Sequence, residues 1–144
     1  MNLMHELHLN LFPILGAAVA RMALGALWYS PVLFLKPWMR MTGIGEQQMK
    51  QGMGAKIAGD IVGSLLMALV LAHMVAWAGA MDAVVGMFVG FLCWLGFVAV
   101  ATIHTVTYEK RPFNLFALHN GYNLAALLAM GAILAVWGGA VPVR

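Results

Sequence analysis

The stretch "GALWYSPVLFLKPWMR", residues 25–40, runs from an apolar segment into a proline and then into two cations and a second tryptophan. Proline has no N–H to donate, and it pushes the preceding residue away from helical backbone, so the Ser30-Pro31 pair predicts a helix end. Aromatic rings around this point favour the headgroup level of a bilayer, and the cations beyond it can bind lipid phosphates. The stretch therefore predicts where a membrane helix leaves the bilayer and continues along its inner surface.

The composition indicates a membrane protein rather than a soluble one. Of the 144 residues, 63% are hydrophobic and only 9% are charged, whereas a soluble domain carries about 25% charged residues. The net charge of +3 comes from scattered lysines and arginines, so we expect no nucleic-acid partner. The one cysteine, Cys93, lies in an apolar stretch and cannot form an intrachain disulfide. The length allows one domain, over residues 1–144.

Four segments are long enough to span a bilayer, which needs about 20 mostly apolar residues. They lie at about residues 9–30, 57–77, 83–104 and 115–137. The expected fold is all-α, an integral membrane four-helix bundle with a short interfacial segment between the first two spans. Within that segment Glu46 and Lys50 stand at i,i+4, which suits a short helix on the membrane surface.

The distribution of cations predicts the orientation, because cationic loops stay in the cytoplasm. Six lysines and arginines lie around the first and third connections, which share one side of a four-span protein: Lys36, Arg40, Lys50, Lys56, Lys110 and Arg111. The other side has Arg144 and the amino terminus. We therefore expect both termini to lie outside the cytoplasm. The N-terminal "MNLMHELHLN" has no cation, which argues against a cleaved signal peptide.

Two long stretches carry a family resemblance. "ALGALWYSPVLFLKPWMRMTG" (23–43) and "WLGFVAVATIHTVTYEKRPFNLFALHNGYNLAALLAMGAILAVW" (94–137) together resemble the small bacterial membrane proteins grouped as domain of unknown function 1761. The specific parts are the Trp-Tyr-Ser-Pro turn and the Arg-Pro-Phe connection that leads into a polar start of the fourth span. The resemblance implies four spans and a single compact domain, which we expect in a bacterial inner membrane, and it implies no activity or functional residues.

Two ionisable residues fall inside the predicted spans, where charges are costly and usually face protein or water. Arg21 lies nine residues before Ser30, or about 13 Å along a helix. Its side chain either extends toward the surface or finds a partner inside the bundle, and Asp60 on the second span is the candidate. Asp60 has an alternative partner in Lys56, one helical turn earlier.

The fourth span opens with "ALHNGYN", residues 117–123. His119 and Asn123 stand at i,i+4, and Asn120 and Asn123 at i,i+3, so the three share one face of a helix. These residues fall at about the depth of Arg21 and Asp60, together with Ser64 and Thr102. Because polar groups in hydrocarbon need partners, the sequence predicts either a hydrogen-bonded layer or a cytoplasm-facing cavity at this level.

Two functions follow from these alternatives. In the first, the protein is a transport or ligand-binding component for a small polar or anionic ligand: Arg21 attracts the anionic group, His119, Asn120 and Asn123 orient it, and Asp60 balances Arg21 or carries a proton. In the second, it is a non-catalytic structural or accessory subunit whose polar layer only holds helices together. An ion pair between Arg21 and Asp60 favours the second, and an unpaired Arg21 favours the first.

No motif for an enzyme or a cofactor stands out. The sequence has no Walker loop, dinucleotide fingerprint or Gly-x-Ser-x-Gly turn. It favours a protein that is not an enzyme, leaves that question open, and predicts no catalytic residue and no cofactor. His5, His8 and His73 lie toward the outer side and are of a type that binds zinc or copper, but their spacing is common by chance and we predict no metal site.

Small residues recur at four-residue spacing in the spans, as in "GDIVG" (59–63) and "GMFVG" (86–90). Such seams let membrane helices approach closely. Seams that the bundle leaves uncovered would pack against a second copy of the chain in a homo-oligomer. The expected partners are therefore this second copy, the lipid bilayer and a small polar or anionic ligand.

Overall fold

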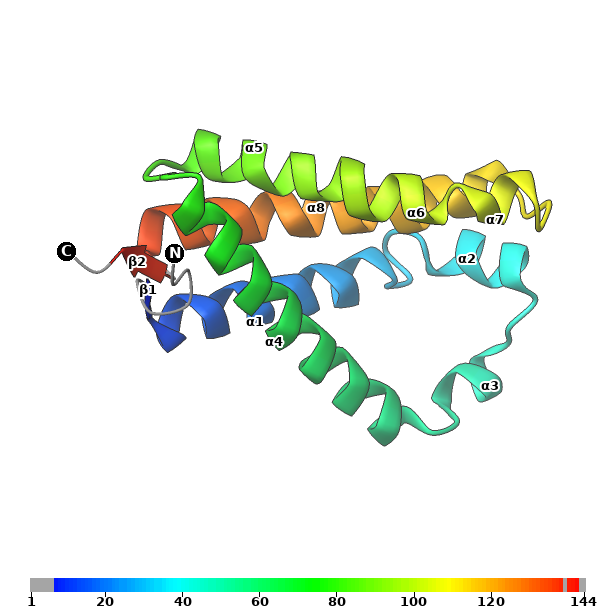
Figure 1. The fold of residues 1–144 in the computed structure, drawn as a ribbon. Coiled ribbons are helices and arrows are strands. Elements are labelled where there is room, and N and C mark those ends of the chain that lie inside the picture. The colour runs from blue at the N-terminus through cyan, green and yellow to red at the C-terminus, as the bar shows by residue number, and fades with distance from the viewer. Residues whose placement is uncertain (1–6, 139, 143–144) are drawn as a thin grey trace.

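The computed structural model describes residues 7–138 and 140–142. Within these residues, four helices are long and apolar enough to cross a membrane: Leu11–Trp28, Met53–Trp77, Ala83–Thr107 and Phe113–Trp137. They lie alongside one another in a membrane-type four-helix bundle, which confirms the expected all-α fold class (Figure 1). The bounds differ from the expected ones by a few residues, most at the second helix, which begins at Met53 rather than near residue 57.

The first of these helices is α1 (Leu11–Trp28) and the second is α4 (Met53–Trp77). Between them lie two short helices, α2 (Leu35–Thr42) and α3 (Glu46–Lys50). The third span is continuous but irregular. Its parts are α5 (Ala83–Cys93), a π-helical turn η1 (Trp94–Ala99), α6 (Val100–Thr102) and α7 (His104–Thr107). The fourth span is α8 (Phe113–Trp137), and two short strands, β1 (Leu7–Leu9) and β2 (Ala140–Pro142), pair antiparallel next to it.

Local sequence explains how α1 begins and ends. The Asn10 side chain accepts a hydrogen bond of 3.2 Å from the backbone N–H of Phe12, which satisfies one of the free donors at the helix start. The helix ends at Trp28, just before Ser30-Pro31, as the proline predicts. The Ser30 hydroxyl donates to the carbonyl oxygen of Leu27 at 2.6 Å, so a carbonyl in the last turn also has a partner.

Glycines bring α5 and α8 into direct backbone contact. A Cβ atom added at Gly90 would lie 2.8 Å from the carbonyl carbon of Leu127, and one added at Gly86 would lie 2.6 Å from Cβ of Ala135. Gly131 on α8 faces Gly86 across the same contact. The seam "GMFVG" is therefore used inside the bundle. The seam "GDIVG" on α4 is not, because added Cβ atoms at Gly59 and Gly63 would meet no other described atom within 4 Å.

The main cluster of buried apolar residues lies at one end of the bundle, which we call the closed end. It lies next to the β1–β2 pair and is built from α1, α4, α5 and α8, with Ala17, Ala68 and Met130 fully buried. Toward the other end α4 diverges from α1 and α8 (Figure 1), and residues 51–63 are all exposed. We call that end, which carries α2, α3 and the α7–α8 connection, the open end.

Candidate functional site

A cavity of about 1070 Å³ occupies the open end, where α4 diverges from the bundle. Its walls come from α1, α2, α3, the first half of α4 and α8, with the α2–α3 connection closing one side. The lining residues are Arg21, Met22, Gly25, Ala26, Tyr29, Leu35, Trp38, Ile44, Gln48, Met49, Gln51, Met53, Lys56, Ile57, Asp60, His119 and Tyr122.

The segment between α1 and α4 lines this cavity, and its turns depend on proline and glycine residues. The break at Pro31 lets the chain turn back over the bundle, where Leu35 is buried. Gly43 (φ 72°) ends α2 and Gly52 (φ 63°) precedes α4, both in the left-handed region that favours glycine. These turns place α3 opposite α1, with the cavity between them.

Arg21 lies on α1 at the end of the cavity where α1 and α4 converge, which we call the narrow end. Its Nη1 donates to the Ser64 hydroxyl at 2.8 Å, and Ser64 is fully buried on α4 where the two helices begin to pack. The guanidinium carbon lies 5.6 Å from the centre of the Tyr122 ring, a cation–π arrangement. Nε is buried and has no hydrogen-bond partner among the described residues. Arg21 is therefore held by neutral groups.

Asp60 lines the same cavity, one helical turn before Ser64, but its side chain is exposed. Over the described part of the chain, neither Arg21 nor Lys56 forms an ion pair with it, and the ion pairs present join Glu109 to His104 of α7 and to Arg111 of the α7–α8 connection. The Lys56 ammonium instead donates to the last backbone carbonyls of α3, at 3.1 and 3.3 Å. The positive charge of Arg21 thus has no paired carboxylate within the described residues.

His119 reaches the cavity from α8 and meets Tyr29. The Tyr29 hydroxyl and His119 Nδ1 share a hydrogen bond of 2.7 Å. Tyr29 follows the last residue of the first spanning helix. Burial raises the pKa of its hydroxyl to about 12, with Tyr122 adding to the rise and Arg21 offsetting part of it, so the phenol stays protonated at neutral pH. The Tyr29 ring also packs edge-on against Trp38 of α2, with ring centroids 6.3 Å apart.

Tyr122 links the two helices that carry Arg21 and His119. Its hydroxyl donates to the backbone carbonyl of Arg21 at 3.1 Å. Gly25 makes this contact possible, because a Cβ atom there would lie 2.9 Å from the Tyr122 hydroxyl oxygen. The sequence pattern indicates Tyr29 only as an aromatic residue at the membrane boundary, and it does not single out Tyr122. A usable signal was the spacing of Arg21, Gly25 and Tyr29 at i, i+4 and i+8, which places them on one face of α1.

The two asparagines do not line the cavity. Asn120 is 4% exposed, and its Nδ2 donates to the Thr102 hydroxyl on α6 at 3.1 Å. The Trp94 indole donates to the Asn120 backbone carbonyl at 2.9 Å, next to the π-helical turn. Asn123 donates to the backbone carbonyl of His119 at 3.0 Å. The predicted polar level therefore divides into a cavity group, with Arg21, Asp60 and His119, and a helix-joining group around Asn120.

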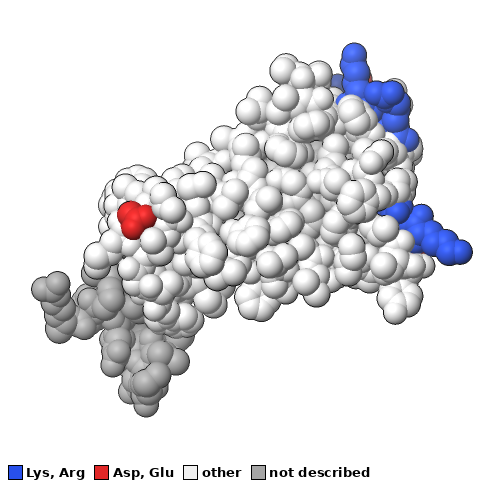
Figure 2. Space-filling view, turned by 90° about the horizontal axis from the view of Figure 1, so that it is seen from above, with Lys and Arg blue, Asp and Glu red and all other residues white. Residues whose placement is uncertain are grey.

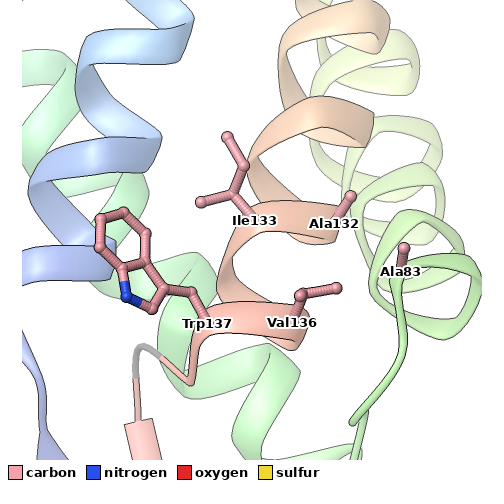
Figure 3. Close-up of a pocket in the computed structure, with 5 residues that line it drawn as sticks. All are labelled: Ala83, Ala132, Ile133, Val136 and Trp137. Carbon is pink, nitrogen blue, oxygen red and sulfur yellow. The ribbon is translucent and has the colours of Figure 1, made fainter.

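The hollow at the closed end is lined mainly by apolar side chains. It has a volume of about 440 Å³ and is lined by Ala83, Ala132, Ile133, Val136 and Trp137, and Figure 3 shows the Trp137 ring directed toward α1. Among the outer histidines, His5 lies outside the described residues and the structure does not describe the side chain of His8. His73 Nδ1 is 2.7 Å from the carbonyl oxygen of Leu69. No group of three metal-binding side chains occurs in the part of the chain that the structure describes.

Comparison with known proteins identifies the family but not the activity. The family described as "Protein of unknown function (DUF1761)" matches residues 12–135, which include the cavity and nearly all of α1 and α8. No curated protein and no solved structure matches the chain. The match confirms the resemblance carried by the Trp-Tyr-Ser-Pro turn and the second half of the sequence. The chain belongs to the DUF1761 family.

Proposed function

We propose that this protein is a small membrane transport or ligand-binding component that takes a small polar or anionic ligand into the cavity at its open end. The observation that carries this proposal is the state of Arg21. Arg21 belongs to a membrane-spanning helix and lines a large cavity. Among the described residues its charge meets only a hydroxyl and an aromatic ring. A charge inside a span is costly and marks functional sites, and guanidinium groups suit carboxylate and phosphate ligands.

Each cavity residue has a role in this proposal. Arg21 binds the anionic group, while Ser64 and Tyr122 hold the guanidinium in place. The His119–Tyr29 pair supplies further polar contacts and orients the ligand. Asp60 lies on the wall where it offsets part of the positive charge or carries a proton.

Asn120 and Asn123 support the site from behind the cavity. The bond of Asn120 to Thr102 joins α8 to the third span, and Asn123 bonds to the backbone of His119 itself. In this proposal the two asparagines act by fixing the position of His119 rather than by touching the ligand.

The location follows from the cations. The six lysines and arginines of the first and third connections belong to segments at the open end, and Figure 2 shows lysine and arginine side chains gathered at one end of the molecule. Under the rule that cationic loops stay inside, the open end faces the cytoplasm of a bacterial inner membrane and both termini lie outside. The cavity then opens toward the cytoplasm.

Thiol accessibility tests whether the cavity is hydrated. In a Cys93→Ala background, single cysteines replace Met22 and Ile57 on the cavity wall, and oriented vesicles are treated with a membrane-impermeant thiol reagent. We expect labelling at both positions from the cytoplasmic face only. Cysteines at the fully buried Ala68 and at Leu66, which is exposed but lines no cavity, serve as controls and should not react. Unreactive cavity positions would contradict a hydrated site.

Binding measurements test the role of Arg21. Arg21→Met should abolish acetate-dependent changes in tryptophan fluorescence, and Arg40→Met, which removes an exposed arginine outside the cavity, should leave them unchanged. Loss of the signal in both variants, or in neither, would contradict the proposal.

A structural or accessory role is the second candidate, and the Asn120 contacts favour it. Hydrogen bonds from Trp94 and to Thr102 join α8 to the third span, as expected of residues that only hold helices together. This role predicts that Arg21→Met lowers stability in detergent without any change in ligand response. The two candidates thus differ in one experiment on one variant.

A homo-oligomer also belongs to this proposal. Gly59 and Gly63 form a small-residue face on α4 that no described residue covers, unlike the glycines of α5. A second copy packing there would use the seam as GxxxG helix pairs do. Native mass spectrometry from detergent should show an oligomer that Gly63→Leu dissociates; a monomeric wild type would contradict it.

A further inference from the structure

Arg21 and most of the apolar side chains of the cavity wall come from different elements. Arg21 stands at the narrow end, where α1 and α4 begin to pack through Ser64. The Lys56 ammonium, nearer the mouth, is already bound to backbone carbonyls of α3. Arg21 is therefore the cation that a ligand meets at the narrow end.

The rest of the wall is largely apolar. Side chains from α2, the α2–α3 connection, α3 and the first turns of α4 face the cavity and not the core. They are Leu35, Trp38, Ile44, Met49, Met53 and Ile57. A hydrated inorganic ion makes no use of such a wall, whereas an apolar ligand body gains by leaving water for it.

Size and charge narrow the ligand class further. A volume of about 1070 Å³ is close to the upper limit for ligand sites, because sites that bind drug-sized molecules have volumes of about 300–1,000 Å³. Asp60 adds a negative charge to the same wall, which disfavours a ligand with two negative charges. Arg21 at the narrow end, with Asp60 on the same wall, thus matches a monovalent anion with a sizeable body.

The depth of Arg21 separates this ligand from an intact phospholipid. Arg21 lies eight residues before Tyr29 at the end of the span, or about 12 Å along the helix. A phospholipid phosphate stays at the headgroup level, near the aromatic and cationic residues of the open end. A free amphipathic acid has no such restriction.

We infer that the cavity binds an amphipathic organic monoanion, an aliphatic or aromatic carboxylate whose charged group meets Arg21 and whose apolar body lies along α2, α3 and α4. This inference rests on the proposed function and names its ligand class. It places the carboxylate at the narrow end and the body toward the mouth.

A carboxylate series tests the inference. The whole protein is placed in nanodiscs of phosphatidylcholine, and binding of acetate, butyrate, hexanoate, octanoate and inorganic phosphate is measured by calorimetry, with empty nanodiscs subtracted. We expect weak binding of acetate and phosphate, and affinity that rises about threefold to fourfold for each added methylene. Arg21→Met should remove binding throughout the series.

Two isoleucines of α4 provide a matched pair of variants. Ile57 lines the cavity and Ile61, one turn later and similarly exposed (46% and 42%), does not. Ile57→Gln should weaken octanoate binding at least threefold and weaken acetate binding less, while Ile61→Gln should leave octanoate binding unchanged. Equal losses in the two variants would overturn the inference.

The remaining outcomes separate this inference from the proposed function. Arg21-dependent binding that does not grow with chain length would overturn the amphipathic class and leave an anion site in place. Competition of octanoate with phosphatidylglycerol, added to the nanodiscs, would overturn it in favour of a lipid headgroup. Octanoate binding that persists in Arg21→Met, or no binding of any probe, would overturn both.

Discussion

Replacing Gly90 by alanine tests the contact on which the bundle depends most directly. The new Cβ atom would lie 2.8 Å from the carbonyl carbon of Leu127 and 3.3 Å from the next backbone nitrogen. Both neighbours are backbone atoms of α8, so no side chain can rotate away. To reach an ordinary contact of about 3.4 Å or more, α5 must move away from α8, and overpacking of this kind costs about 1–3 kcal/mol.

Gly96→Ala is the matched control, because it makes the same chemical change in the same span at a position where a Cβ atom meets nothing within 4 Å. Alanine in a helix interior is favoured over glycine by up to about 1 kcal/mol. The free energy of unfolding, from sodium dodecyl sulfate titration in mixed micelles followed by circular dichroism, should therefore be about 2 kcal/mol lower for Gly90→Ala than for Gly96→Ala. Equal stability of the two variants would refute the close packing of α5 on α8.

Three further predictions follow from the site and the topology. Gly25→Ala should push the neighbouring tyrosine hydroxyl away, since the new Cβ would lie 2.9 Å from it; octanoate affinity measured by calorimetry should fall severalfold, and an unchanged affinity would contradict the geometry. Asn120→Ala removes an interhelical hydrogen bond and should cost about 0.6–1.7 kcal/mol in the same unfolding titration, whereas no loss would mean that the bond does not form in the folded protein. Single cysteines that replace Lys50 and Lys110 in a Cys93→Ala background should both react with the membrane-impermeant thiol reagent from the cytoplasmic face of oriented vesicles. Reaction of either cysteine from the other face would contradict the orientation.

The helices and their ends were predictable because they depend on local sequence. An apolar run of sufficient length partitions into a bilayer whatever its neighbours are, and Pro31 ends a helix through its own backbone chemistry. The same holds for the short helix α3, whose Glu46 and Lys50 stand one turn apart. The extra helical turn at Met53 was missed because it precedes the apolar run that defined the span.

The division of the polar residues was not predictable from depth alone. His119 and Asn120 are neighbours in the chain and stand at the same level, but successive residues of a helix point about 100° apart. One therefore faces the cavity while the other faces α6. The hypothesis of one shared site grouped residues by their height in the membrane, whereas their direction around α8 depends on which helices pack on each side.

The sequence by itself determined the membrane setting, the four spans, the helix end at Ser30-Pro31 and the depth of Arg21, because each depends on the chemistry of a short segment in lipid or at its surface. The tertiary structure decided which glycine seam is used and where α4 diverges. It also decided that Arg21 meets Ser64 and Tyr122 and not Asp60. These features arise from packing between segments far apart in the chain, and the cavity exists because α4 packs on α1 and α8 only from Ser64 onward.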